Sequence, residues 1–232
     1  MTYRIKQTKP IDSKQLGYFL AGLIDADGHI NKKEIVITFH ANDLSVAHYL
    51  KHVIGHGSIR KLSNKRAYNF EIYSKLGGSQ VAKLIENKLR LPLRISQYNQ
   101  CLVSKIGCVN TKQDQSCLLS NHWLAGFIQG DGSFQIKLLK RKTGRLRVQL
   151  TVQISLKTEY ILREIQNKFG GYVGFRQAHN TYYYSSGSFI NAKKFIDYFT
   201  IYQVMGSKFK AYCLWEKAFP LPEVKGKGSK CK

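Results

Sequence analysis

One nine-residue stretch occurs twice in this chain and constrains its fold more than any other feature. Residues 20–28 and 124–132 are identical at six of their nine positions. The second copy begins 104 residues after the first, close to half of the 232-residue chain. Self-similarity at such a spacing is the signature of a duplicated structural unit. The sequence therefore predicts two halves of related fold, each organised around one copy.

Each copy has the pattern of a helix, because apolar residues recur at helical spacing. These residues are Leu16, Phe19, Leu20, Leu23 and Ile24 in the first copy and Trp123, Leu124, Phe127 and Ile128 in the second. Asp12 or Ser13 is the expected N-cap, and Gln15 stands three residues after Asp12, as in a capping box. Gly28 and Gly132 are expected to end the helices, because glycine enters the left-handed conformation freely.

Small residues lie inside both predicted helices. They are Ala21, Gly22, Ala26, Ala125, Gly126 and Gly130. A glycine inside a helix costs about 1 kcal/mol relative to alanine. Close approach of two backbones would compensate for this cost, so the two helices are predicted to pack against each other.

Asp27 and Asp131 occupy the same position in the two copies, at the C-terminal end of each predicted helix. The helix dipole is negative there and disfavours a carboxylate by about 0.3–1 kcal/mol. Packed helices would bring both acids together, and like charges that close repel unless a cation lies between them. A divalent metal site explains the pair. The alternative, that each aspartate only caps a turn before glycine, is disfavoured because the residue recurs in both copies.

The first copy reads LAGLIDADG letter for letter, and over nearly its whole length the chain resembles the single-chain, two-motif LAGLIDADG homing endonucleases. The resemblance implies an α+β fold of two pseudo-twofold related αββαββα repeats. The motif helices would pack at the centre, and two antiparallel saddle-shaped sheets would bind the DNA major groove. We expect a first repeat over residues 1–106, a linker over 107–120, a second repeat over 121–222 and a basic disordered tail over 223–232.

The resemblance also implies that the acid at the eighth motif position binds catalytic metal. Here those residues are Asp27 and Asp131, and Ala26 and Gly130 before them are assigned to the same site. Mg²⁺ is expected, because it prefers carboxylate, water and phosphate oxygens, and Ca²⁺ is expected to replace it without supporting cleavage. The sixth position is Asp25 in one copy and Gln129 in the other, so no metal role is assigned to it.

Further catalytic candidates come from aligning the two halves. The family carries a solvent-ordering polar residue on the strand after the first hairpin, where His40 aligns with Gln153. It commonly carries a phosphate-stabilising basic residue before the last helix, where Lys208 aligns with Gln97. Lys157 is a weaker basic candidate. The histidines show no metal-binding spacing, so a histidine-metal nuclease is disfavoured.

Alternation along the predicted strands gives each half one polar sheet face. Major-groove recognition needs side chains that donate and accept hydrogen bonds at base edges. The candidates are Ser133, Gln135, Lys137, Arg145, Arg147, Gln149, Thr151, Arg176, Gln177 and Tyr182 in the second repeat, and His29, Asn31, Thr38, Arg60, Asn69, Glu71 and Tyr73 in the first. An ordinary solvated face is the alternative. The first hairpin of repeat one is much shorter, so its half-site is expected to be read less fully.

Composition narrows the function class. The chain carries 37 Lys and Arg against 14 Asp and Glu, a net charge of +23 that points to nucleic acid or another anionic surface. The apolar fraction of 43% is that of a folded globule, which argues against basicity of the disordered-tail or ribosomal-protein type. Five cysteines without C-x-x-C pairing make a zinc site or a disulfide framework improbable and fit a reducing compartment.

These observations lead to one main functional hypothesis. The chain is expected to be a site-specific homing endonuclease that makes a double-strand break in a long DNA target by metal-dependent phosphodiester hydrolysis. The alternatives are an RNA maturase that assists group I intron splicing, with intron RNA as partner, and a cleavage-inactive DNA-binding protein. We expect a monomer without a membrane or obligate protein partner. Its location is expected to be organellar (mitochondrion or chloroplast) or otherwise intracellular, without secretion, since no signal-peptide pattern opens the chain.

Overall fold

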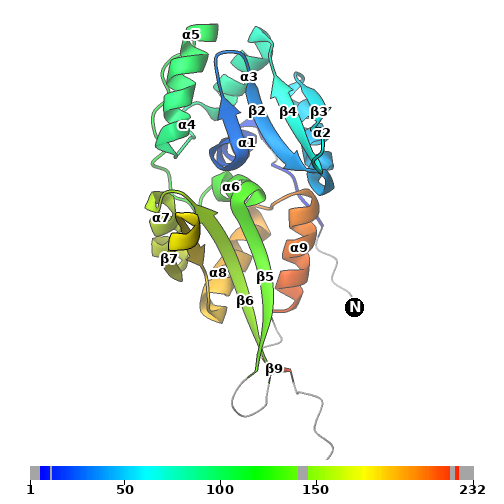
Figure 1. Ribbon diagram of the computed structural model, residues 1–232, viewed down its shortest axis with the longest axis vertical. Helices are drawn as coiled ribbons and strands as arrows, with labels where there is room; N and C mark the ends of the chain where they lie inside the picture. Colours follow the sequence, from blue (N-terminus) through cyan, green and yellow to red (C-terminus); the bar gives the residue numbers. More distant parts are fainter. Residues whose placement is uncertain (1–5, 11, 141–145, 220–222, 225–232) are drawn as a thin grey trace, which may run out of the picture. The chain divides into compact units, whose positions relative to one another are not determined.

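The computed structural model describes residues 6–10, 12–140, 146–219 and 223–224 (Figure 1). Arg145 and residues 225–232 of the predicted tail lie outside these residues, whereas the first two residues of that tail, predicted to be disordered, form a short strand (Glu223–Val224). The chain divides into two compact units. The first contains the residues up to Asp131 together with Ile201–Phe209, and the second contains Gly132–Thr200 and the residues from Lys210 onward. Within the described ranges, no helix combines the length and the apolarity that crossing a bilayer requires.

The first unit places helices around a four-stranded antiparallel sheet with strand order β1-β2-β4-β3. Its strands are β1 (Gly28–Ile30), β2 (Ile35–His40), β3 (Ser58–Lys61) and β4 (Ala67–Ile72). Its helices are α1 (Ser13–Asp27), α2 (Leu44–Ile54), α3 (Lys75–Ile85), α4 (Pro92–Gln97), α5 (Val103–Ile106) and α6 (Trp123–Asp131), with a π-helical segment over Tyr98–Leu102.

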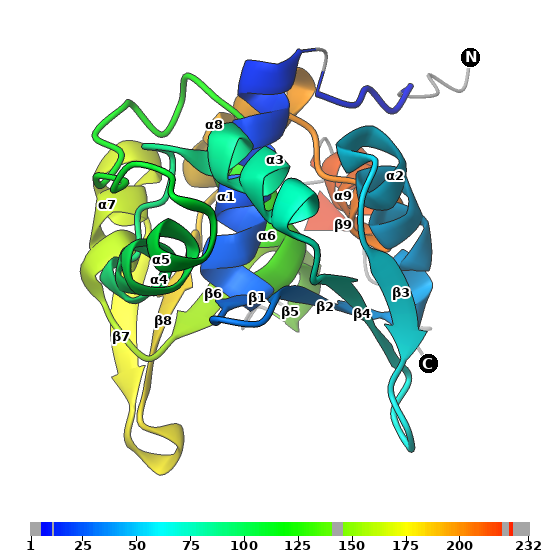
Figure 2. The same cartoon turned by 90° about the horizontal axis from the view of Figure 1, so that it is seen from above.

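The two motif helices, α1 and α6, pack directly against each other in this unit (Figure 2). A Cβ atom added to Gly22 would lie 1.9 Å from the Trp123 carbonyl oxygen, and one added to Gly126 would lie 1.9 Å from the Phe19 carbonyl oxygen. No side chain fits at either position. The prediction that the interior glycines allow close backbone approach is confirmed.

The ends of α1 differ in part from expectation. Asp12 caps the helix by accepting from the Gln15 amide at 2.7 Å, as predicted. The Gln15 side chain does not complete the capping box, because its oxygen accepts from the His122 amide at 3.1 Å instead. Gly28 was expected in the left-handed conformation, but its φ of −84° is extended and it begins β1. A Cβ there would lie 2.6 Å from the Ile24 Cα, so crowding rather than a positive φ requires this glycine.

Helix α3 contains two consecutive glycines, Gly77 and Gly78, close to its start. Ser74 supplies the N-cap by accepting from the Gly77 amide at 3.1 Å. A Cβ on Gly77 would lie 2.8 Å from Ile72 Cγ2, so tight packing explains this glycine.

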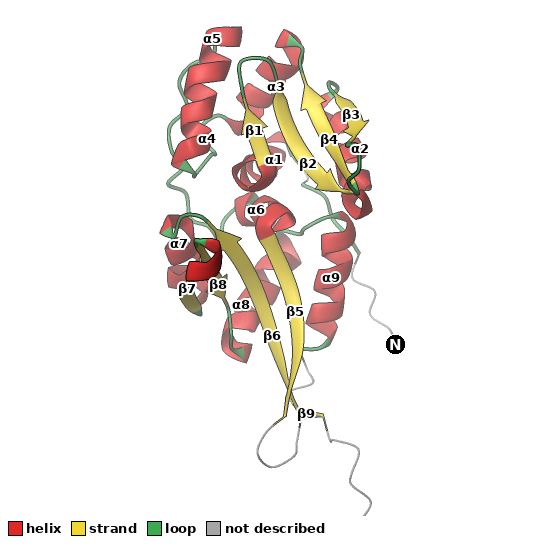
Figure 3. Ribbon diagram, viewed as in Figure 1, coloured by secondary structure: helices red, strands yellow, loops and turns green. Residues whose placement is uncertain are grey.

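The second unit repeats the strand arrangement, with order β5-β6-β8-β7 and a short β9 paired with β6 (Figure 3). Its strands are β5 (Gly132–Lys140), β6 (Leu146–Leu156), β7 (Tyr172–Arg176), β8 (Thr181–Ser185) and β9 (Glu223–Val224). Its helices are α7 (Tyr160–Phe169), α8 (Phe189–Ile201) and α9 (Gly206–Lys217), the last two crossing the boundary between the units.

Along β6, the predicted alternation is confirmed. Val148, Leu150, Val152 and Ile154 are buried on one face. Phe134 of β5 joins this core, with its ring 5.3 Å from that of Phe199 and 5.6 Å from that of Trp215. Counting α6 with the strands that follow it, each half of the chain runs helix-strand-strand-helix-strand-strand-helix, as the predicted α+β class requires.

Candidate active site

The two motif acids stand at the adjacent C-terminal ends of α1 and α6, within the first unit. A Cβ built on Gly130 would lie 2.8 Å from Asp27 Oδ2 and 2.6 Å from the Ala26 Cβ. The carboxylate of Asp27 therefore lies against the backbone of the residue that precedes Asp131. Because residue 130 is a glycine, there is room for the C-terminal ends of α1 and α6 to meet.

The surroundings of the acids disfavour two negative charges. Burial, and next to it the negative charge of Asp27, raise the pKa of Asp131 to about 7. Asp27 keeps contact with solvent, yet the protein on its other sides displaces enough water to raise its pKa as well. Positive charge beside these groups would stabilise both carboxylates.

Two basic side chains act on both acids. The positive charges of Arg94 and Lys208 oppose the rise in pKa of Asp27 and of Asp131. Burial lowers the pKa of both basic groups, and the neighbouring acids counteract that shift. The site therefore contains two acids and two basic residues, which come from four separate helices.

Arg94 was not identified as a site residue from the sequence, because Gln97 was aligned with Lys208. Helix α4 begins at Pro92 and α9 begins at Gly206, so Arg94 and Lys208 are each the third residue of their helix. The sequence alignment was thus three residues out of register. The signal that could have corrected it was Pro92, because proline is favoured in the first turn of a helix.

Gln97 connects Arg94 to the first strand. Its side-chain oxygen accepts from the Ile30 amide at 3.3 Å and from Arg94 Nη1 at 3.1 Å. Its amide nitrogen lies 3.3 Å from Nδ1 of His29. Arg94 also donates through Nε to the Ile24 carbonyl oxygen at 3.0 Å. Gln97 thus holds the guanidinium at the end of α1.

Lys208 is held by the start of α9. Asp43 accepts from the amide and the hydroxyl of Ser207 at 2.7 and 2.8 Å, so it caps this helix from another part of the unit. Gly206, at a φ of 59°, leaves room for that carboxylate, since a Cβ would lie 2.5 Å from Asp43 Oδ1. Both observations restrain the backbone next to Lys208.

A cavity of about 120 Å³ joins several predicted residues. It is lined by Leu23, Asp27, Thr38, Phe39, His40, Asp43, Gln129, Gly130 and Lys208. His40 therefore shares a cavity with Asp27 and Lys208, and its Nδ1 accepts from the Asn42 amide at 3.2 Å. Gln153, its predicted counterpart, belongs to the second unit, where it accepts from Gln135 at 2.8 Å.

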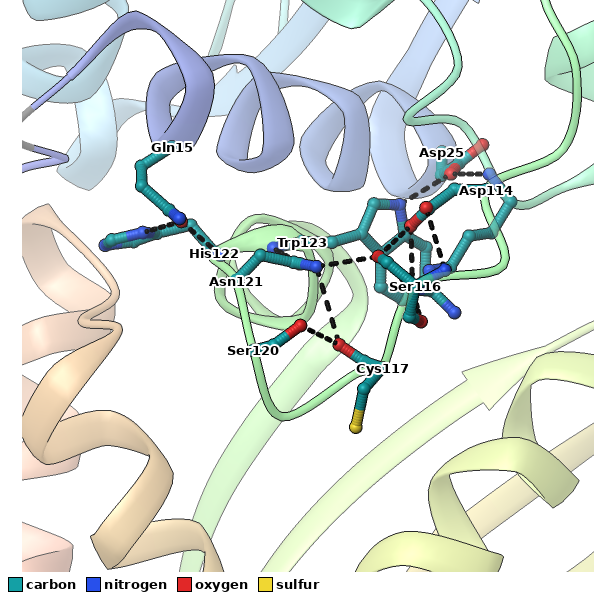
Figure 4. Close-up of polar contacts among 10 residues, drawn as sticks. Gln15, Asp25, Asp114, Ser116, Cys117, Ser120, Asn121, His122 and Trp123 are labelled. Atoms are coloured by element: carbon teal, nitrogen blue, oxygen red, sulfur yellow. Dashed lines mark hydrogen bonds and ion pairs between the residues drawn. The ribbon is translucent and has the colours of Figure 1, made fainter.

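The linker predicted between the halves is fixed by a buried polar network (Figure 4). Arg90 and Asp114 form an ion pair of 2.7 Å, and both side chains are almost fully buried. Asp25 accepts from the Trp123 indole nitrogen at 2.9 Å. Ser116 donates to Asp114 at 2.8 Å and accepts from Asn121 at 2.9 Å. The network ties the chain before α6 to α1 and to the segment before α4.

Polar residues predicted on the first sheet gather around Glu71. Its carboxylate accepts from Arg60, Asn69 and Tyr73 at distances of 2.5 to 3.1 Å for the shortest contact of each. A hydrogen bond to Glu34, followed in importance by the hydrogen bond to Glu71, raises the pKa of Tyr73 to about 12. Glu71 itself is buried, so it organises Arg60 and Asn69 instead of presenting its own carboxylate as predicted.

The remaining candidates of this sheet lie on one face or in a turn. Thr38 is exposed and donates to Asn69 Oδ1 at 3.0 Å across the β2–β4 pair. His29 is also exposed. Asn31 uses its side-chain oxygen to accept from the amides of Lys33 and Glu34, which fixes the β1–β2 turn.

Most of the polar residues predicted for the second sheet lie together on one of its faces. Register places Ser133, Gln135 and Lys137 opposite Gln153, Thr151 and Gln149, with Arg147 next along β6. Gln149 donates to the Gly187 carbonyl oxygen at 3.1 Å, and Gln177 lies in the 3-10 turn after β7. Thr151 is buried, which removes it from the accessible part of this face.

Tyr182 was assigned to the wrong face. It pairs with Leu156, on the same side as the buried pair of Tyr184 with Ile154. Tyr183 instead shares the polar face with Arg176, whose guanidinium lies 4.5 Å from the Tyr183 ring centroid. Because residues 182–184 are all tyrosine, the sequence shows no apolar-polar alternation there. The burial of Tyr184 in the structure shows which face of the sheet each tyrosine occupies.

The acids fit a small divalent cation. Two carboxylates supply hard oxygen donors, and Gly130 leaves their approach free of a side chain. Among the residues with described positions, no cluster of three or more His, Cys, Asp or Glu forms a complete protein cage. Magnesium suits such a pair, since it is commonly bound through one or two carboxylates together with water and substrate phosphates.

Two family models match the chain: a LAGLIDADG-like domain over residues 14–87 and a LAGLIDADG endonuclease over residues 124–219. An uncharacterized cox1 intron-2 protein of Schizosaccharomyces pombe is 41% identical over 92% of this chain and 68% of its own length. The chain belongs to the LAGLIDADG endonuclease family. Each family match contains one motif acid.

Two Saccharomyces cerevisiae relatives are less similar. The intron-encoded DNA endonuclease aI3 is 25% identical over 93% of this chain and 66% of its own length. The intron-encoded RNA maturase bI4 is 27% identical over 79% of this chain and 28% of its own length. The chain thus spans about two thirds or less of these longer relatives.

Solved LAGLIDADG structures share the fold. The meganuclease I-AabMI bound to uncleaved DNA matches with a TM-score of 0.68 at 21% identity, over 88% of this chain and 90% of that one. I-SmaMI, bound to an uncleaved DNA target in the presence of calcium ions, matches with a TM-score of 0.66 at 22% identity over the same shares.

Proposed function

We propose that this protein is a site-specific homing endonuclease that cuts both strands of a DNA target by divalent-metal-dependent hydrolysis. One observation carries the proposal: Asp27 and Asp131 stand together at the ends of α1 and α6, with Arg94 and Lys208 acting on both. Phosphodiester hydrolysis needs negative groups to hold a cation and positive groups to stabilise the charge that develops on phosphate. This arrangement supplies both.

Each residue has a distinct proposed role. Asp27 and Asp131, with the backbone at Ala26 and Gly130, would hold Mg²⁺, which supplies positive charge for the phosphate oxygens. Arg94 and Lys208 would each donate hydrogen bonds to one scissile phosphate. Gln97 holds Arg94, as its 3.1 Å contact supports, and His40 would order solvent in the cavity that it shares with Lys208. Gln153 keeps its proposed solvent-ordering role for the other strand.

The polar sheet faces are proposed to bind the DNA. In the first unit the contacts would come from His29, Asn31, Thr38, Arg60, Asn69 and Tyr73, and in the second from Ser133, Gln135, Lys137, Arg147, Gln149, Arg176, Gln177 and Tyr183. The strands β1 and β2 have 3 and 6 residues, against 9 and 11 in β5 and β6. The shorter hairpin would read fewer bases, so the half-site of the first repeat is proposed to be less specific.

Incubation of the purified protein with a randomised DNA library tests the proposal. With Mg²⁺, cut ends should map to one sequence motif, and with Ca²⁺ the same motif should be enriched by binding without cleavage. Cleavage at unrelated sequences, or no cleavage of any library sequence with Mg²⁺ or Mn²⁺, contradicts the proposal.

A second function is supported by similarity to the maturase bI4, so RNA binding in group I intron splicing is the runner-up. Splicing assays of candidate intron RNA with and without the protein separate the two. Acceleration of splicing by a protein that lacks Asp27 and Asp131 would show an RNA role independent of cleavage. The names of the intron-encoded relatives also favour an organellar or other intracellular site of action. We propose in addition that the protein acts as a monomer.

A further inference from the structure

The sixth motif position differs between the copies and has no part in the proposed chemistry. It is Asp25 in α1 and Gln129 in α6, and both side chains are buried. Residues two apart on a helix point about 200° away from each other, because each residue turns the helix by about 100°. The sixth-position side chain therefore points away from the eighth-position acid of its own helix, although Gln129 also borders the cavity that Asp27 and Lys208 line.

Both sixth-position side chains accept hydrogen bonds from backbone amides at equivalent positions of the two repeats, at the start of the helix that carries the basic residue. Asp25 accepts from the Arg90 amide at 2.8 Å and the Leu91 amide at 3.2 Å, and Leu91 is the N-cap of α4. Gln129 accepts from the Met205 amide at 2.8 Å, and Met205 directly precedes α9. The bonded Leu91 and Met205 amides each lie three residues before the basic residue of the helix that follows, Arg94 or Lys208.

We propose that Asp25 and Gln129 are positioning residues, each of which anchors the helix that presents the basic side chain of its own repeat. The interaction needs only an oxygen acceptor on a backbone N–H, which explains why a carboxylate serves in one copy and an amide in the other. Asp25 satisfies a third donor, the Trp123 indole, whereas the nitrogen of Gln129 has no hydrogen-bond partner among the described residues. The effect of this anchoring on catalysis rests on the proposed function.

The first test measures position without activity. Gln129→Met keeps the length of the side chain but removes the acceptor, so the Met205 amide loses its partner. Hydrogen exchange followed by mass spectrometry should then become faster in the segment around residues 203–209, with little change around residues 90–96. Asp25→Leu, which keeps a similar side-chain size but removes both acceptor oxygens from the Arg90 and Leu91 amides, should give the reverse pattern. Unchanged exchange around residues 203–209 in a folded Gln129→Met protein would overturn the proposal.

The second test uses cleavage and separates positioning from general stability. Gln129→Met should slow the strand served by Lys208 by about 10²-fold, as expected when a group that acts on the substrate is misplaced by about 1 Å. In a Lys208→Met background the same change should add no more than about twofold, since it acts through that lysine. Ile128→Val, which shortens the neighbouring buried side chain, should leave the ratio of strand rates unchanged.

The outcomes separate this inference from the proposed function. If the wild-type protein does not cleave, the proposed function fails, and the exchange experiment still decides whether Gln129 anchors α9. If the wild type cleaves but Gln129→Met slows both strands equally, or slows them further in the Lys208→Met background, then Gln129 serves the fold alone and the inference is wrong.

Discussion

Arg94 and Lys208 are each the third residue of a helix that begins beside the paired acids, although no sequence motif relates them. Both act electrostatically on Asp27 and on Asp131. The sequence alignment of Lys208 with the uncharged Gln97 is therefore replaced by one basic residue in each repeat. This equivalence changes the expected behaviour of single variants.

Removing either basic side chain should turn the enzyme toward a nickase. Lys208→Met and Arg94→Met are each expected to slow one strand by about 10²–10³-fold, because a charge-stabilising donor to the reacting phosphate is lost. The two variants should slow opposite strands. Strand-specific end labels on one cognate duplex measure both rates. Equal slowing of both strands by either variant would assign that residue to binding or folding.

Either motif acid should be indispensable for double-strand cleavage. Asp27→Asn and Asp131→Asn should abolish linearisation of a target plasmid but leave DNA affinity within a few fold, because these acids hold the cation and do not contact bases. Electrophoretic mobility shift in Ca²⁺ measures the affinity of the same preparations. Retained double-strand cleavage by either variant would remove that acid from the site.

DNA affinity should depend steeply on salt. If the sheet faces neutralise several phosphates, the logarithm of the association constant should fall with the logarithm of salt concentration, with a slope of about 0.9 per phosphate contacted. Fluorescence anisotropy between 50 and 300 mM KCl, roughly the range where such losses are resolved, gives the slope. A nearly flat dependence is incompatible with an extended electrostatic footprint.

The contact between α1 and α6 should not tolerate a methyl group. Gly126→Ala is expected to destabilise the protein by about 3 kcal/mol or more, at the upper end of overpacking effects, because its Cβ would overlap the Phe19 carbonyl oxygen. Gly78→Ala is the matched control. Its Cβ would have its nearest neighbour at 3.7 Å, so the gain in helix propensity should stabilise by up to about 1 kcal/mol. Urea unfolding of both variants gives the comparison.

Stability should fall in mild acid through His122. Burial lowers the pKa of this histidine to about 4, and the negative charge of Asp12 opposes the shift only in part. The neutral ring contacts Gln15 at 2.9 Å and the edge of Tyr202. The unfolded state takes up a proton below about pH 6.5 and the folded state only near pH 4, so the unfolded state gains stability between these values.

The expected loss from His122 is about 1 to 3 kcal/mol between pH 7 and pH 4. His122→Gln removes the titrating group, so the difference in unfolding free energy between wild type and variant should shrink as the pH falls. Chemical denaturation at pH 7, 6, 5 and 4 measures this difference. If it stays constant over the range, His122 titrates alike in both states.

Some of the molecule followed directly from local sequence. The interior glycines of the motif, the capping Asp12 and the alternation along β6 each predicted a local structure that is present. These predictions succeeded because each depends on contacts between near neighbours in the chain or on a property repeated in both copies. The pairing of Asp27 with Asp131 also followed, since two copies of one helix that pack symmetrically bring equivalent residues together.

Other features were decided by residues far apart in the chain. Glu71 of β4 is buried where Arg60 of the neighbouring strand β3 donates to its carboxylate. Tyr183 rather than Tyr182 lies on the polar face because the β6–β8 register places it there. A shift of one residue in register exchanges the two faces of a strand. Short sequence windows carry no information about such pairings.

The sequence alone determined that two LAGLIDADG helices would pack and place one acid at each end, because the motif encodes that contact in its glycines. Only the tertiary structure decided which basic residues face those acids. Local similarity of residues 96–98 to residues 207–209 placed Gln97 against Lys208 in the sequence alignment. The hydrogen bonds from Leu91 to Asp25 and from Met205 to Gln129 set the start of each helix in space, and they bring Arg94 and Lys208 to equivalent positions.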